Sequence, residues 1–274
     1  MSVFPIPTTL SPSRITSYEN CPLQFRFASV EGLPQPPGIH AVKGNVVHRA
    51  LELLFGLERA ERTRDAAHRF MGVAREEYEP TYDITGLNLT DAQLNSFWSE
   101  CSDLVDGYLA MEDPREVHGV EQEIFVTADL GPFALRGYVD RLERRPDGTI
   151  VITDYKTGKS PNPNYPDGKM KQLEMYAYML REMRGELASL LQLYYVKDGT
   201  KNLATPSEQS MNFVRTRTTA MFTTISKACT TGNFPTKKGG LCNFCAYKDW
   251  CPEFGGDPSK AAVEAPLKYP QPPQ

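Results

Sequence analysis

Two aspartates and a lysine carry the clearest chemical signal in this sequence. Asp140 ends the motif Gly137-Tyr138-Val139-Asp140, and Asp154 and Lys156 belong to Asp154-Tyr155-Lys156-Thr157-Gly158. On neighbouring strands, two such carboxylates come within reach of one metal ion. A Mg2+ or Mn2+ ion held there would relieve their repulsion, polarise a phosphate oxygen and activate water, while Lys156 stabilised the developing charge. Asp and Lys two apart at a strand end are by themselves more often a solvated sheet edge, so the interpretation depends on their surroundings.

Three further polar residues favour the chemical interpretation. Gln172 and Tyr176 lie four residues apart, on one face of a helix predicted to follow the acidic motifs. His48 lies near the apolar face of an earlier predicted helix and is a candidate further ligand. A single histidine on such a face is more often a hydrogen-bonded core residue, and only the accompanying acids favour the ligand role here.

Four of the six cysteines show the pattern of metal ligands. Cys242 and Cys245 are separated by two residues, Cys251 follows six positions later, and Cys21 lies more than two hundred residues upstream, before a proline. The spacing suits zinc or an iron-sulfur cluster and does not choose between them. Disulfides are disfavoured because the spacing is uneven and the chain begins with no secretory signal. The remaining two cysteines, Cys101 and Cys229, lie on apolar helix faces and are expected in the core.

Helices and strands must alternate to position these residues. Apolar residues at helical spacing predict helices over about residues 11–21, 44–60, 63–78, 90–111, 168–184 and 206–230. Strands are predicted at 120–128, 133–144, 149–156 and 190–197, the first three as an antiparallel meander. The acidic motifs thereby fall on a hairpin. A phosphate-binding loop ending at Gly158-Lys159-Ser160 is excluded, because Thr153 stands where its first glycine is required.

Composition limits the remaining possibilities. The chain has 274 residues, 40% of them hydrophobic, and no apolar run long enough to span a bilayer, so we expect a cytoplasmic protein with a sizeable core. Its net charge of -4 gives no global attraction to nucleic acid, so any DNA contact must be local. Residues 255–274 are rich in Gly, Pro, Ser and Lys and are expected to form a disordered tail after a single domain of residues 1–254.

Taken in order, the motifs resemble the RecB/AddB-type PD-(D/E)XK nucleases, in the branch that carries an iron-sulfur cluster and includes CRISPR-associated RecB-like exonucleases. The resemblance spans about residues 11–254 and rests on Ser13-Arg14, Cys21-Pro22, His48, Gly137 to Asp140, Asp154 to Gly158, Gln172 with Tyr176, and the cysteine trio. It implies a restriction-endonuclease-like α/β fold. In this fold helices flank a mixed central sheet, and a 4Fe-4S cluster joins the N- and C-terminal segments.

The resemblance also implies roles for individual residues. The catalytic Mg2+ or Mn2+ would be bound by His48, Asp140 and Asp154 with help from the Tyr155 carbonyl. Lys156 would be catalytic, Gln172 and Tyr176 would support the site, and Glu121 or Glu123 would add a carboxylate. The cluster ligands would be Cys21, Cys242, Cys245 and Cys251.

The acidic motifs predict a metal-dependent nuclease, and the resemblance implies a DNA exonuclease that acts on single-stranded ends in recombination, repair or CRISPR-type DNA processing. DNA would be its substrate, and proteins of such a complex would be its partners. The main alternative is a catalytically silent DNA-binding or scaffold subunit with a structural iron-sulfur or zinc site, against which the intact acidic residues argue. An electron-transfer or redox-sensing protein would leave the acids and Gln172 unexplained.

Overall fold

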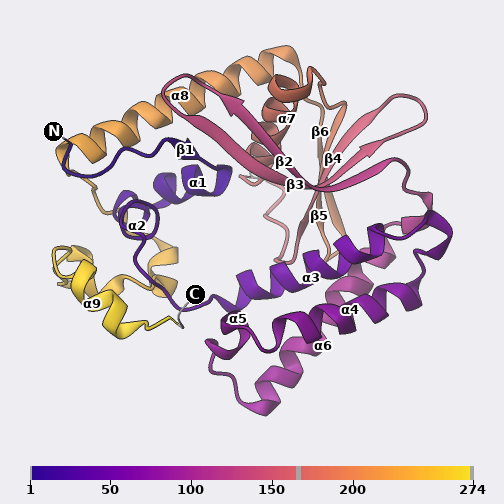
Figure 1. Cartoon of the computed structure of the whole chain (residues 1–274), viewed down its shortest axis with the longest axis horizontal. Coiled ribbons are helices and arrows are strands. Elements are labelled where there is room, and N and C mark those ends of the chain that lie inside the picture. The colour runs from indigo at the N-terminus through magenta and orange to yellow at the C-terminus, as the bar shows by residue number, and fades with distance from the viewer. Residues whose placement is uncertain (1, 165–167, 272–274) are drawn as a thin grey trace. The chain divides into compact units, whose positions relative to one another are not determined.

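The computed structural model describes residues 2–164 and 168–271, and the chain divides into two compact units (Figure 1). The first unit comprises Met1–Pro36, Ala128–Arg136 and Asn212–Gln274, and the second comprises Pro37–Thr127 and Gly137–Met211. Each unit is assembled from segments that lie far apart in the sequence, which no local sequence pattern reveals. The single domain expected over residues 1–254 stays a prediction.

The second unit contains most of the regular structure. Its helices are α3 (Ile39–Phe55), α4 (Arg64–Tyr78), α5 (Tyr82–Thr85), α6 (Asp91–Met111) and α7 (Met170–Arg184). Its strands are β4 (Ile150–Lys156), β5 (Leu190–Tyr195), β6 (Thr200–Ala204) and the larger parts of β2 (Val120–Asp129) and β3 (Ala134–Arg144). The elements predicted for this part of the chain are thus present. β6 was not predicted, and it follows the turn at Gly199, whose φ is +70°.

The strands form one mixed sheet. Its order is β1-β3-β4-β5-β6, and β2 also pairs with β3. β3 and β4 are antiparallel, β4 and β5 are parallel, and β5 and β6 are antiparallel. Helices flank the sheet, so the predicted α/β class is confirmed, and the arrangement is consistent with a restriction-endonuclease-like fold.

Two helical layers hold the strands of the second unit in place. The apolar faces of α3, α4 and α6 share one core with Tyr155 of β4 and Tyr194 of β5. α6 begins at a capping box, in which Thr90 and Gln93 bond each other's backbone. α7 packs against β4 and β5, on the side of the sheet away from α3 (Figure 1).

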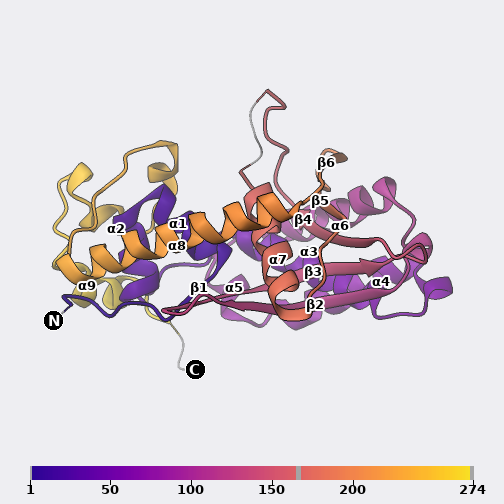
Figure 2. The same ribbon diagram turned by 90° about the horizontal axis from the view of Figure 1, so that it is seen from above.

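The first unit gathers both ends of the chain. It contains β1 (Thr9–Leu10), parallel to the start of β3, with α1 (Pro12–Asn20), α2 (Pro22–Phe25), α9 (Ala261–Lys268) and most of α8 (Glu208–Thr231). The N-terminal segment runs beside α8 in both views (Figure 1 and Figure 2), and the Phe4 N–H donates to the Cys229 carbonyl at 2.9 Å.

The C-terminal segment differs from the expected disordered tail. Residues 261–268 form α9, because Ala261 and Ala265 are small enough to be fully buried four residues apart. The last part of that expected tail, residues 272–274, lies outside the described residues. Over residues 2–164 and 168–271, no helix has the length and apolar character needed to cross a membrane.

Candidate metal centre and cysteine site

The paired region of β3 and β4 stops where the acidic motifs begin. Its register runs from Arg144 opposite Ile150 to Arg141 opposite Thr153. Just beyond it, the backbone N–H of Tyr155 donates to Oδ2 of Asp140 at 3.2 Å. A carboxylate thus bonds the backbone here, and Asp140 is fixed beside the strand that carries Asp154.

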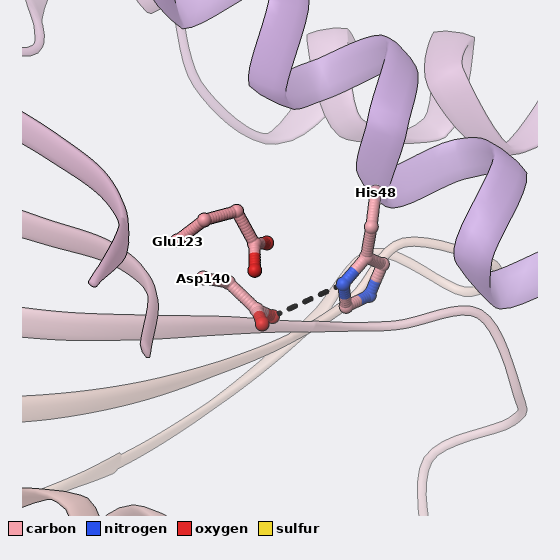
Figure 3. A group of neighbouring side chains, drawn as sticks. All are labelled: His48, Glu123 and Asp140. Atoms are coloured by element: carbon pink, nitrogen blue, oxygen red, sulfur yellow. Dashed lines mark ion pairs between the residues drawn. The ribbon is translucent and has the colours of Figure 1, made fainter. Parts of the chain in front are cut away.

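His48 reaches the same point from α3 (Figure 3). Its Nδ1 lies 3.3 Å from Oδ2 of Asp140, and its Nε2 lies 2.8 Å from the Tyr155 carbonyl oxygen. Burial lowers the pKa of His48, but the charge and hydrogen bond of Asp140 outweigh this effect and raise the pKa to about 9. Because a carbonyl oxygen only accepts, Nε2 carries a proton, and Nδ1 is the nitrogen that can bind a metal once deprotonated.

Glu123 completes a three-residue group with His48 and Asp140. Each offers one ligand atom, and these atoms all lie within 4.8 Å of one another (Figure 3). Burial and the charge of Asp140 raise the pKa of Glu123 to about 7. Glu121, the other sequence candidate, pairs instead with Arg144 at 3.2 Å and with Arg184 at 2.9 Å. Glu123 is therefore the glutamate at the site.

Asp154 and Lys156 lie next to this group as an ion pair. The Lys156 ammonium lies 2.5 Å from Oδ2 of Asp154, whose side chain is almost fully buried. Burial and the charge of Asp140 raise the pKa of Asp154 to about 6. The pKa of Asp140 moves the other way: burial raises it, but the neighbouring His48 outweighs burial and lowers it. The two aspartates thus differ in how readily they carry charge.

Gln172 and Tyr176 of α7 also reach the site. Gln172 Nε2 donates to the Tyr176 hydroxyl at 2.8 Å. Burial raises the pKa of Tyr176, this hydrogen bond lowers it, and the charges of Asp154 and Asp140 add to the rise. α7 packs directly against Gly137 of β3. A Cβ at this position would lie 2.5 Å from the Tyr176 ring, so a larger residue would push the helix away. The glycine of the first acidic motif is therefore a packing requirement.

A buried polar network behind the site was not anticipated from the sequence. The Arg141 side chain is 1% exposed. It pairs with Glu112, donates to Glu143 at 2.6 Å, and donates to the Tyr155 hydroxyl at 2.8 Å. Tyr155 is thus held through its hydroxyl by Arg141 and through its carbonyl by His48. The only signal in the sequence was that Arg141 is a charged residue at a strand position that faces the core. The alternation of β3 identifies that position only when the pairing with the neighbouring strand is known.

The four cysteines of the predicted ligand set all belong to the first unit, and each is partly buried. After burial, which raises the pKa of the Cys245 thiol most, the charges of Cys21, Cys251 and Cys242 act on it in the same direction. Cys21 ends α1, as the sequence predicted, and also precedes α2, a short helix that begins at Pro22 and was not predicted. The other two cysteines, Cys101 and Cys229, are fully buried, also as predicted.

The site of the second unit offers carboxylate oxygens, the donors that hard divalent cations prefer, together with one histidine nitrogen. A cavity beside it is lined by His48, Glu123 and Asp140, among others. Burial and, after it, the charge of Asp140 raise the pKa values of Glu123 and Asp154, and a divalent cation would favour the ionised form of both. The residues present therefore fit Mg2+ or Mn2+.

Comparison with known proteins gives a family match and two distant relatives. The family model of the PD-(D/E)XK nuclease superfamily matches residues 9–252. The chain is 24% identical to the Gene 69 proteins of Mycobacterium phage D29 and Mycobacterium phage L5, in each case over 89% of this chain and 96% of the relative.

A solved structure is also similar. It is that of a candidate exonuclease from Eubacterium rectale, which matches with a TM-score of 0.53 at 11% identity, over 87% of each chain. At this level of identity the likeness concerns the fold alone. It supports the assignment of a mixed sheet flanked by helices.

Proposed function

Because the chain belongs to the PD-(D/E)XK nuclease superfamily, we propose that it is a metal-dependent DNA exonuclease that hydrolyses phosphodiester bonds at single-stranded ends. The observation that carries the proposal is the convergence of His48, Glu123 and Asp140 beside the ion pair of Asp154 and Lys156. A structural salt bridge would explain the last two residues. It would not explain three further metal-binding groups next to them.

The ligands of the ion would be His48 through Nδ1, the carboxylates of Glu123, Asp140 and Asp154, and the Tyr155 carbonyl. Such an ion supplies a Lewis acid for the phosphate oxygen and lowers the pKa of its bound water. The Tyr155 carbonyl oxygen already accepts from His48 Nε2, and its second lone pair is available to the ion.

Lys156 would supply positive charge where the reaction develops negative charge. Its side chain is only 19% exposed and its ammonium lies against Asp154, so few side-chain conformations are open to it. In this position it can donate to the attacking water or to a phosphate oxygen. The hydroxyl of Tyr176, bonded to Gln172, would fix the α7 side of the site.

We further propose that the thiols of Cys21, Cys242, Cys245 and Cys251 hold a structural 4Fe-4S cluster. The placement of all four partly buried thiols in the first unit and the resemblance to the iron-sulfur branch of the nucleases support it. Zinc is the competing occupant, because four thiolates suit it equally. Iron and zinc analysis of anaerobically purified protein, with an absorption spectrum, distinguishes the two.

The nuclease proposal is tested with end-labelled single- and double-stranded DNA and anaerobically purified protein. We expect Mn2+ to support release of nucleotides from single-stranded ends and EDTA to stop it. Asp154→Asn should remove the activity. DNA binding without any metal-dependent cleavage would contradict the proposal and favour the silent scaffold subunit.

A further inference from the structure

Phe125 of β2 and Tyr138 of β3 form an aromatic pair on the open surface of the second unit. Their ring centroids lie 5.5 Å apart, and their side chains are 43% and 56% exposed. They are the two exposed aromatic side chains in the described part of that unit. A cross-strand aromatic pair stabilises a sheet. That role alone does not require both rings to remain in water, where much of their apolar area stays unburied.

The pair adjoins the candidate metal centre along both strands. Tyr138 precedes Asp140 by two residues on β3, and Phe125 follows Glu123 by two residues on β2. Residues two apart on a strand lie about 6–7 Å apart along it. Glu123 interrupts the regular alternation of β2 with a φ of 46°, but Glu123 and Phe125 are both exposed on this strand. The rings therefore occupy the neighbourhood that the nucleotide next to a metal-bound phosphate would enter.

Unpaired bases are the ligands that suit such a surface. Proteins that bind single-stranded nucleic acid stack successive bases on exposed aromatic side chains, and every base offers a flat face for this contact. In a duplex, pairing and stacking already occupy those faces. The acidic group beside the rings also disfavours an anionic protein surface as their partner, whereas a phosphate reaches that group together with its metal ion.

Building on the proposed nuclease function, we propose that Phe125 and Tyr138 form a stacking platform for the unpaired base that flanks the scissile phosphate. The platform deepens that function by selecting the substrate. A nucleotide whose base is free gains the stacking contact, and a paired nucleotide must first leave its helix. Single-stranded ends are thereby preferred at the step of binding.

The test measures binding of a fluorescent twelve-nucleotide oligothymidylate in Ca2+, with a single abasic residue placed at each position in turn. For the wild-type protein, we expect one or two positions at which loss of the base weakens binding about tenfold. In the double variant Phe125→Leu, Tyr138→Leu, the intact oligonucleotide should bind about tenfold more weakly and no position should matter. Leucine keeps apolar volume on the strands but lacks an aromatic face.

Leu203→Ala is the matched control, since Leu203 is a 57% exposed apolar residue of β6 in the same unit. It should leave the abasic profile unchanged. A flat profile for the wild-type protein, or an unchanged profile for the double variant, overturns the platform. If the wild-type protein cleaves DNA but its profile is flat, the platform alone is wrong. If it shows the profile but never cleaves DNA in Mn2+, the nuclease proposal is wrong and the platform stands.

Discussion

Asp154→Asn should remove cleavage and, in the absence of metal, make the protein more stable. The ionised carboxylate of Asp154 is disfavoured in the folded state, because burial and Asp140 raise its pKa from 3.8 to about 6. This rise corresponds to about 3 kcal/mol at neutral pH, and asparagine mimics the uncharged form. We expect a gain in the free energy of unfolding of about 1–3 kcal/mol at pH 7.5 in EDTA. The gain should shrink below pH 6 and vanish below pH 4, where Asp154 of the wild-type protein is protonated in both states.

Asp140→Asn provides the control of opposite sign. The pKa of Asp140 is lowered by His48, so its charge is favoured in the folded state and its removal should destabilise the protein. Urea unfolding is best followed in a Trp250→Phe background. The remaining tryptophan, Trp98, then reports on the second unit. Equal destabilisation by both substitutions would refute the reasoning, because it would mean that the ion pair of Asp154 with Lys156 stabilises the folded protein.

Three further predictions follow from the pKa values, the cysteines and the buried network. In calorimetric titrations, the apparent affinity for Mn2+ should rise by up to about tenfold per pH unit between pH 7 and 8.5. The reason is that His48, with a pKa of about 9, must lose a proton to bind the metal. An affinity that does not change with pH would contradict this role of His48. Cys245→Ser should abolish absorbance near about 400 nm and destabilise the first unit, whereas Cys229→Ser, at a buried cysteine of the same unit, should keep the absorbance. Arg141→Met should cost about 3–5 kcal/mol in urea unfolding, because it removes the cationic partner of Glu112 and leaves the buried Glu143 only the more distant Arg145, at 3.5 Å. A loss below about 1 kcal/mol would show that water reaches these carboxylates.

The elements of the sheet and the main site residues could be predicted because their signals are local. Alternating strands, glycine turns and helical apolar spacing define β3, β4 and α7 within short windows. These elements carry Asp140, Asp154, Lys156 and the pair of Gln172 and Tyr176. Cys21 was identifiable from a proline that forces a turn, together with the unusual spacing of its three distant partners.

What could not be predicted depends on contacts between distant segments. The choice between Glu121 and Glu123 required the partners of each, and Glu123 adopts a φ of 46°, which is uncommon for a residue with a side chain. The ion pair of Arg141 with Glu112 joins β3 to the end of α6, and the spacing of these two residues in the sequence does not predict it. The division into two units likewise depends on where a chain that leaves a unit returns.

The most direct test of the central claim compares the wild-type protein with Lys156→Met in single-turnover cleavage of end-labelled single-stranded DNA. Mn2+ affinity and urea unfolding are measured on the same preparations. The proposed mechanism predicts that the variant folds and binds Mn2+ but cleaves at least about a hundredfold more slowly, because the charge that stabilises the transition state is lost. Cleavage at the wild-type rate by a folded, metal-bound Lys156→Met protein would contradict it.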